Sequence, residues 1–168
     1  IDWGKTDMNL KLAAAAIAVL TVTAAGAARA ADFVTIPLET TVNAPADVAW
    51  KKVSGFCDIG AWMKTTCEIT SGKNNEVGAI RRIANRIDEL LVAETAWSYT
   101  YSQPKSPIDY HGTVEIRPID KGHSKLMYTL VYDAAALPHP ENKDQDVANR
   151  TKQFTNVLNV IKGIAEAK

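Results

Sequence analysis

The sequence predicts an α+β domain in which one antiparallel sheet is folded around a long C-terminal helix, with two short helices after the first strand. Alternating stretches rich in β-branched residues occupy most of the chain as far as residue 133. Short polar segments separate successive stretches, which favours antiparallel neighbours. Apolar residues then recur at helical spacing to the end of the chain. A helix with one apolar face needs a partner surface, and the sheet supplies it.

The first strand and the two short helices are predicted between residues 33 and 63. Residues 33–42 alternate and are rich in β-branched side chains, so they predict a strand. Pro45 fits the first turn of a helix that is expected to stop at Gly55. Asp58 is the expected cap of a second short helix over residues 58–63.

Six further strands are predicted between residues 67 and 133, and a long helix follows them. The strands are expected at residues 67–71, 77–84, 87–94, 97–103, 110–117 and 124–133. Turn-forming clusters at residues 72–75, 104–107 and 120–122 separate some of them. From about Glu141 to Ala167, apolar residues recur at three- and four-residue steps, which predicts one amphipathic helix.

The start of the chain is interpreted as a secretory leader. Residues 8–30 contain a basic residue, an apolar run, and then Ala28-Arg29-Ala30, the small residues that a signal peptidase favours before its cut. The apolar run is shorter than the ~20 residues that a spanning helix needs, and a retained membrane anchor is the alternative. Residues 1–7 precede the expected initiator Met8 and are interpreted as an upstream extension.

The mature chain is therefore expected to be one domain over residues 31–168. It is expected in the periplasm, with no stable membrane span after processing. In the full sequence 19 Lys and Arg residues balance 19 Asp and Glu residues, and without a basic stripe no nucleic-acid partner is expected. No phosphate-binding, dinucleotide-binding or zinc-binding pattern occurs, so neither a cofactor nor a metal is expected.

Cys57 and Cys67 are the two cysteines of the chain. In an exported protein they are expected to form one disulfide. A pair of free redox thiols is the alternative, although the spacing lacks the C-x-x-C arrangement that tunes thiol pKa values.

Large residues share the inward face of the later strands. Period-two alternation places Trp97, Tyr99, Tyr101, Tyr110, Tyr128 and Tyr132 on that face. Aromatic rings with polar tips suit a pocket that holds and orients an amphipathic ligand. Ordinary core packing, with the hydroxyls bonded to backbone or water, is the alternative.

Arg81 and Glu89 fall on the apolar faces of two successive predicted strands. An isolated buried charge is very costly, but a paired one can persist, so the two side chains are expected to meet inside. Such a pair can bind a ligand carboxylate or hydroxyl, or act in acid/base chemistry. A purely structural ion pair at the end of the sheet is the alternative.

Several local motifs resemble the START/Bet v 1-like superfamily (SRPBCC), in its polyketide cyclase/dehydrase-like branch. The motifs are the Ala-Pro start of the first helix with Trp50, the FCDIGAWM segment at 56–63, the V-G-x-x-R pattern at 77–81, the E-x-L pattern at 89–91, and the WSYTY strand at 97–101. Their order, from about Thr35 to the C-terminus, implies a helix-grip fold that encloses a cavity for an apolar ligand. The loop before the last helix can border that cavity, so His139 is a candidate gate or ligand contact.

The resemblance leaves three functions open. The first is a non-enzymatic protein that binds a small apolar or amphipathic molecule. The second is an enzyme similar to polyketide cyclases, using Arg81, Glu89 and the tyrosines. The third is an accessory factor with a periplasmic protein partner, because a signal-bearing member of this size also resembles an accessory protein of methanol-oxidation systems. Without an inward histidine, the residues favour binding over catalysis.

Overall fold

The structure is a computed structural model that describes residues 30–167. Residues 1–7 and the predicted leader, apart from Ala30, lie outside the described residues. One antiparallel sheet has the strand order β1-β7-β6-β5-β4-β3-β2. Its strands are β1 (Phe33–Val42), β2 (Cys67–Ser71), β3 (Ile80–Ile83), β4 (Ile87–Thr95), β5 (Ser98–Ser102), β6 (His111–Pro118) and β7 (Ser124–Asp133).

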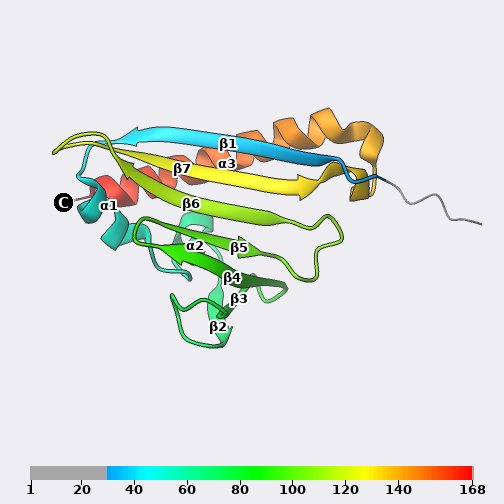
Figure 1. Ribbon diagram of the computed structural model, residues 1–168, viewed down its shortest axis with the longest axis horizontal. Coiled ribbons are helices and arrows are strands. Elements are labelled where there is room, and N and C mark those ends of the chain that lie inside the picture. The colour runs from blue at the N-terminus through cyan, green and yellow to red at the C-terminus, as the bar shows by residue number, and fades with distance from the viewer. Residues whose placement is uncertain (1–29, 168) are drawn as a thin grey trace, which may run out of the picture.

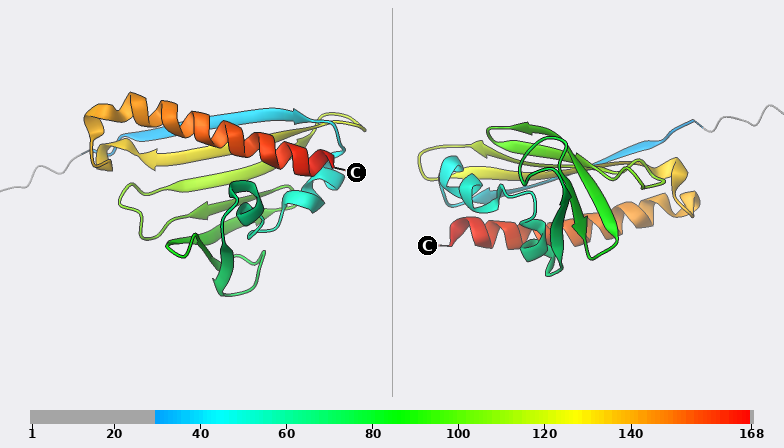
Figure 2. Two further views of the ribbon diagram at one scale, coloured as in Figure 1. Left: turned by 180° about the vertical axis from the view of Figure 1, so that it is seen from behind. Right: turned by 90° about the horizontal axis from the view of Figure 1, so that it is seen from below.

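Three α-helices accompany the sheet, and they complete the predicted helix-grip fold. They are α1 (Ala46–Val53), α2 (Ile59–Met63) and the long α3 (Lys143–Glu166), with short 3₁₀ turns at Ala134–Ala136 and Pro140–Asn142. The sheet curls, and α3 runs along the side toward which it curls (Figures 1 and 2). The α1 and α2 helices lie on the same side of the sheet as α3 (Figure 2).

The core lies between α3 and the sheet, because strand alternation sends one set of side chains inward. In β5, β6 and β7, buried and partly exposed residues alternate as the sequence predicts. The α3 helix contributes Phe154, Leu158 and Ile161 to this core. Its last turn is tied to the segment before α1, where the backbone N–H of Asn43 donates a 2.7 Å hydrogen bond to Glu166.

Three predicted strands begin later than expected, and one of them is β6, which starts at His111 instead of Tyr110. The β3 strand starts at Ile80 rather than Val77, because Gly78 has a φ of +95° and turns the chain out of the extended conformation. The β5 strand starts at Ser98, because Trp97 belongs to the turn that joins β4 to β5. Thr95 Oγ1 accepts a 3.2 Å hydrogen bond from the backbone N–H of Trp97 in this turn.

The predicted disulfide between Cys57 and Cys67 is present. It joins the segment before α2 to the start of β2, and so closes a loop that contains the whole of α2. The expected capping bond of Asp58 is absent from α2, and Asp58 Oδ2 instead accepts a 2.8 Å hydrogen bond from the backbone N–H of Gly55. The disulfide therefore ties the segment that contains α2 covalently to the start of β2.

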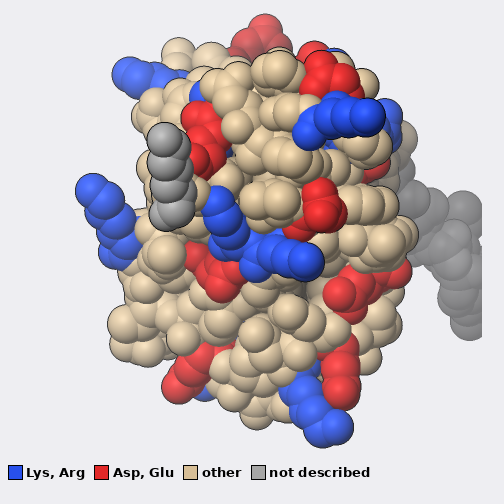
Figure 3. Space-filling view, turned by 90° about the vertical axis from the view of Figure 1, so that its left-hand side faces the viewer, with Lys and Arg blue, Asp and Glu red and all other residues tan. Residues whose placement is uncertain are grey.

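One end of the molecule carries both basic and acidic side chains on its surface (Figure 3). Figure 3 shows acidic and basic side chains interspersed over the end of the molecule where α1 and the C-terminus lie. Between residues 30 and 167, no helix is both long and apolar enough to span a bilayer.

Candidate functional site

A pocket of about 270 Å³, called the inner pocket below, lies between the sheet and helices α2 and α3. Apolar side chains from α2, β3, β4 and the β5–β6 loop form much of its wall, and α3 adds Phe154. Six polar or amphipathic side chains also reach it: Glu89, Tyr101, Gln103, Tyr110, Arg150 and Gln153. A mainly apolar pocket with a few converging polar groups is the usual form of a small-molecule site, although this one lies just below the common range of ~300–1,000 Å³.

Arg81 and Glu89 meet inside the protein, as the sequence predicts. They are direct partners in the β3–β4 register, and both are almost completely buried. Arg81 Nε donates a 2.7 Å hydrogen bond to Glu89 Oε2, and Nη2 lies 2.5 Å from the same oxygen. Arg81 Nη1 donates to the backbone carbonyl of Phe56, and its guanidinium carbon lies 4.1 Å from the centre of the Phe56 ring.

The second oxygen of Glu89 is also occupied. Gln103 Nε2 donates a 2.8 Å hydrogen bond to Glu89 Oε1 at the wall of the inner pocket. Burial lowers the pKa of Arg81, but Tyr99 and Glu89 outweigh this effect and hold the pKa above its usual range. Arg81 therefore stays charged and compensates the charge of Glu89.

The five tyrosines are all buried, and Tyr99, Tyr101, Tyr110 and Tyr128 lie near this pair. The hydroxyls of Tyr101 and Tyr128 lie 2.7 Å apart and share a hydrogen bond. Burial raises the pKa of Tyr99 to about 12, and it raises the pKa values of Tyr101, Tyr110 and Tyr128 as well. At neutral pH these phenols keep their protons, so they can donate hydrogen bonds but cannot act as bases.

Tyr132, on β7, belongs to a separate polar cluster with Asp146 and Arg150 of α3. Its hydroxyl donates a 2.6 Å hydrogen bond to Asp146 Oδ2, and Arg150 Nε donates a 2.7 Å hydrogen bond to the same oxygen. The Arg150 guanidinium carbon lies 4.5 Å from the centre of the Tyr132 ring and 5.8 Å from that of Tyr110. Burial raises the pKa of Asp146, but the hydrogen bonds from Arg150 and Tyr132 outweigh burial and lower it.

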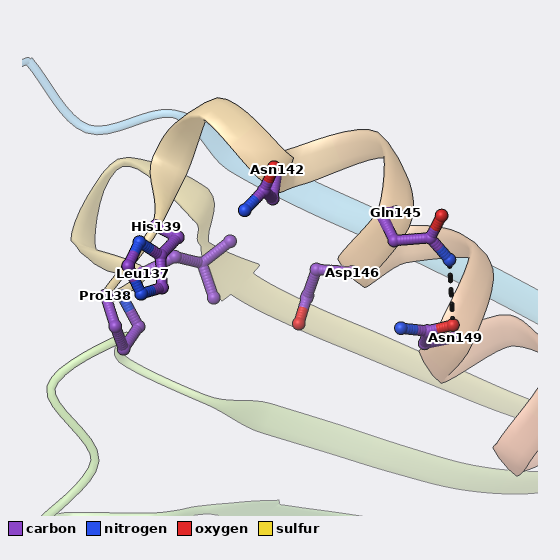
Figure 4. A pocket seen from close by; sticks show the side chains of 7 residues that line it. All are labelled: Leu137, Pro138, His139, Asn142, Gln145, Asp146 and Asn149. Carbon is purple, nitrogen blue, oxygen red and sulfur yellow. Dashed lines mark hydrogen bonds between the residues drawn. The ribbon is translucent and has the colours of Figure 1, made fainter.

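A second pocket of about 450 Å³, called the outer pocket below, lies where the β7–α3 loop meets the first turns of α3. It is lined by Leu137, Pro138, His139, Asn142, Gln145, Asp146 and Asn149. In Figure 4 the loop supplies His139 and Leu137 on one side, and the 3₁₀ turn with Asn142 and the first turns of α3 supply the polar side chains on the other. His139 therefore borders a pocket, as expected of a gate or contact residue, but it borders the outer pocket.

The structure brings most of the predicted site residues together. Six of them lie around the inner pocket or form the ion pair: Arg81, Glu89, Tyr99, Tyr101, Tyr110 and Tyr128. Tyr132 instead contacts Asp146 on α3. The predicted inward position of Trp97 is wrong: its side chain is 37% exposed. The alternation of β5 does not extend into the turn, so the residue before the strand need not continue the inward set.

Sequence reasoning missed Gln103, Asp146 and Arg150. Gln103 immediately follows β5, where alternation no longer fixes direction. The sequence does contain a signal for the inward position of Asp146 and Arg150. They continue the four-residue spacing of Phe154 and Leu158 toward the start of α3. Among residues 30–167, no group of three or more His, Cys, Asp or Glu side chains could hold a metal ion.

Comparisons with known proteins agree with this architecture. The family described as polyketide cyclase / dehydrase and lipid transport matches residues 34–158. A search of functionally curated proteins by sequence gives no match.

Solved structures show the same fold at low identity. A protein from Nitrosospira multiformis is 18% identical with a TM-score of 0.64, covering 77% of this chain and 94% of that chain. The Zhui aromatase/cyclase from Streptomyces sp. R1128 is 19% identical with a TM-score of 0.63, covering 80% and 94%. A point mutant of norcoclaurine synthase from Thalictrum flavum is 14% identical with a TM-score of 0.63, covering 82% and 96%.

The family match spans most of the chain. The fold agrees with it in the strand order, in the packing of the sheet against α3 and in the internal pocket. The chain therefore belongs to the polyketide cyclase / dehydrase and lipid transport family of the SRPBCC, Bet v 1-like proteins.

Proposed function

We propose that this chain is an exported binding protein that holds a small, neutral, amphipathic molecule in the inner pocket without changing it chemically. The observation that carries the proposal is the position of Glu89 and Gln103 at the wall of an otherwise largely apolar pocket. The apolar wall offers a favourable place for a ring or short chain. The carboxylate and the amide fix its polar end by hydrogen bonds.

Charge balance favours a neutral ligand. Glu89 is compensated by Arg81, and Arg150 is compensated by Asp146. A charged ligand would bring an uncompensated charge into a partly desolvated site, at a high cost in free energy. A hydroxyl or carbonyl group can instead exchange hydrogen bonds with Glu89 and Gln103.

The state of the polar groups favours binding over turnover. The buried tyrosines have raised pKa values and stay protonated, and Arg81 stays charged. These groups orient a ligand but do not accept protons from it at neutral pH. Glu89 is the one carboxylate at the inner pocket, so a second candidate function is a cyclase-like enzyme in which Glu89 moves a proton.

Export remains part of the proposal. The leader-like residues 8–30 and the disulfide between Cys57 and Cys67 support it, since structural disulfides persist in oxidising compartments. Fractionation of cells that express the complete chain is expected to recover protein that starts near Ala31 outside the cytoplasm. A protein that keeps its leader and stays in the cytoplasm would contradict export.

Native mass spectrometry of the protein isolated from its compartment tests the binding function. The expected result is an added mass that organic solvent removes, and that returns unchanged after incubation with the protein. Conversion of the extracted molecule to a product would favour the enzyme. Recovery of a stable protein partner with no added small molecule would favour an accessory factor and overturn the proposal.

A further inference from the structure

The inner and outer pockets share a wall made of one ion pair. Asp146 lines the outer pocket and Arg150, one helical turn later on α3, lines the inner pocket. Their side chains are joined by the 2.7 Å hydrogen bond from Arg150 Nε to Asp146 Oδ2. In Figure 4, Asp146 extends from α3 between Leu137 and Asn149, which also line the outer pocket.

This wall between the two pockets is polar and partly exposed. The side chains of Asp146 and Arg150 are 26% and 24% exposed, respectively. Tyr132, whose hydroxyl also holds Asp146, is completely buried and is fixed in β7. A rotation of the Arg150 side chain can therefore break its hydrogen bond to Asp146, while the hydrogen bond from Tyr132 to Asp146 stays in place.

We propose that the two pockets are compartments of one elongated site, divided by the Asp146–Arg150 pair, and that the ligand is an uncharged amphiphile with a hydroxyl-rich head. The inference rests on the proposed function of the inner pocket. The apolar part of the ligand occupies the inner pocket, its head occupies the outer pocket, and displacement of Arg150 joins them. The joined volume reaches the range of common ligand sites, which the inner pocket alone does not.

The chemistry of the outer pocket selects the head. Asn142 at the end of the second 3₁₀ turn, and Gln145 and Asn149 on α3, present side-chain amides, and Gln145 Nε2 already donates a 3.0 Å hydrogen bond to Asn149. Amides both donate and accept, so they match hydroxyl groups. The Asp146 carboxylate accepts hydrogen bonds from both Tyr132 and Arg150, so it keeps the Tyr132 hydroxyl as a partner when Arg150 moves.

Two probes and a matched pair of variants test the inference. 4-Methylphenol is short enough for the inner pocket alone, and octyl glucoside, kept below its micelle concentration, carries both an alkyl chain and a hydroxyl-rich head. Asn149→Trp fills the outer pocket, and Asn159→Trp places the same change at an exposed position of α3 that lines neither pocket. Isothermal titration gives the affinities, and thermal unfolding confirms that each variant is folded.

The expected result separates the two compartments. Asn149→Trp weakens octyl glucoside binding by about tenfold or more, which corresponds to loss of a few head-group hydrogen bonds. It leaves 4-methylphenol binding unchanged, and Asn159→Trp changes neither affinity. If the wild type binds both probes and Asn149→Trp affects neither, the elongated site is wrong while the proposed function stands. If the wild type binds neither probe, both are wrong.

A double substitution tests the dividing pair itself. Asp146→Asn with Arg150→Met removes both charges together, so no unpaired charge remains. Because the divider is then easier to displace, octyl glucoside is expected to bind severalfold more tightly relative to 4-methylphenol than it does in the wild type. Equal or weaker relative binding of octyl glucoside in a folded double variant would show that the pair does not divide the site.

Discussion

Arg81 on β3 stands directly opposite Glu89 on β4, and its Nε donates a 2.7 Å hydrogen bond to the Glu89 carboxylate. Strand pairing alone places this ion pair on the inner face of the sheet. The second carboxylate oxygen is held by Gln103 at the wall of the inner pocket. One buried pair thus connects the stability of the sheet to the polar end of the candidate site.

Breaking this pair on one side should be far more damaging than removing it. Glu89→Leu leaves the Arg81 charge buried without its partner, and it should lower the free energy of unfolding by about 3–5 kcal/mol. Arg81→Met with Glu89→Leu leaves no buried charge and should cost less than Glu89→Leu alone. Urea unfolding measures both variants. A double variant that loses as much stability as Glu89→Leu alone, or more, would contradict a coupled pair.

Two glycines should respond in opposite directions to the same substitution. A Cβ on Gly112 would collide with the ring and hydroxyl of Tyr101, which is fully buried and cannot move aside. Gly112→Ala should therefore destabilise the protein by about 1–3 kcal/mol or more. Gly163→Ala on α3 meets no atom within 4 Å and should stabilise the helix by up to about 1 kcal/mol. Thermal unfolding tests both, and a neutral Gly112→Ala would contradict the packing of Tyr101.

The buried tyrosines predict a loss of stability at alkaline pH. Burial raises the pKa of Tyr99 to about 12 from an ordinary value of 10.0, so the folded state keeps a proton that the unfolded state releases. The stabilisation is complete below pH 10 and is lost as the pH rises toward the folded pKa. Each such tyrosine lowers the free energy of unfolding by about 1.4 kcal/mol per pH unit in that window.

Ultraviolet titration of the phenolates tests this behaviour. The chain has five tyrosines, and none should ionise near its ordinary pKa while the protein is folded. The phenolate signal should instead rise together with loss of the near-ultraviolet circular dichroism of the fold. A tyrosine that titrates near pH 10 in the intact protein would show that its burial is wrong.

Reduction of the disulfide should weaken both the fold and the pocket. The bond between Cys57 and Cys67 closes a loop of ten residues, and losing it should cost about 2–3 kcal/mol. That loop contains Ile59 and Met63, which line the inner pocket, so ligand affinity should fall as well. Urea unfolding with and without dithiothreitol measures the effect. The Cys57→Ala, Cys67→Ala variant is the control and should not respond to the reductant.

The sequence was sufficient for the architecture because periodicity and turn residues are local signals. The full spans of β1 and β7 were predicted, and so was the inward pairing of Arg81 with Glu89. The errors fall where local geometry overrides the pattern. Gly78 takes a positive φ and shortens β3, and Trp97 enters a turn instead of extending β5.

The outer pocket could not be predicted in the same way. It is formed by the 3₁₀ turns after β7 together with the first turns of α3, and their approach depends on the tertiary fold. Asp146 and Arg150 continue the stripe of Phe154 and Leu158 toward the start of α3, but this spacing does not identify the side chains that they contact. Only the fold shows that Tyr132 and Tyr110 lie beneath them.

The most direct test of the central claim is retention of the natural ligand by pocket variants in native mass spectrometry. Gln153→Trp places a large side chain at the inner pocket from an exposed position of α3, and Asn159→Trp is the matched control on the same helix. The wild type and Asn159→Trp should carry the added mass, and folded Gln153→Trp should lose it. An added mass of equal occupancy in Gln153→Trp, or none in the wild type, would contradict a ligand site in the inner pocket.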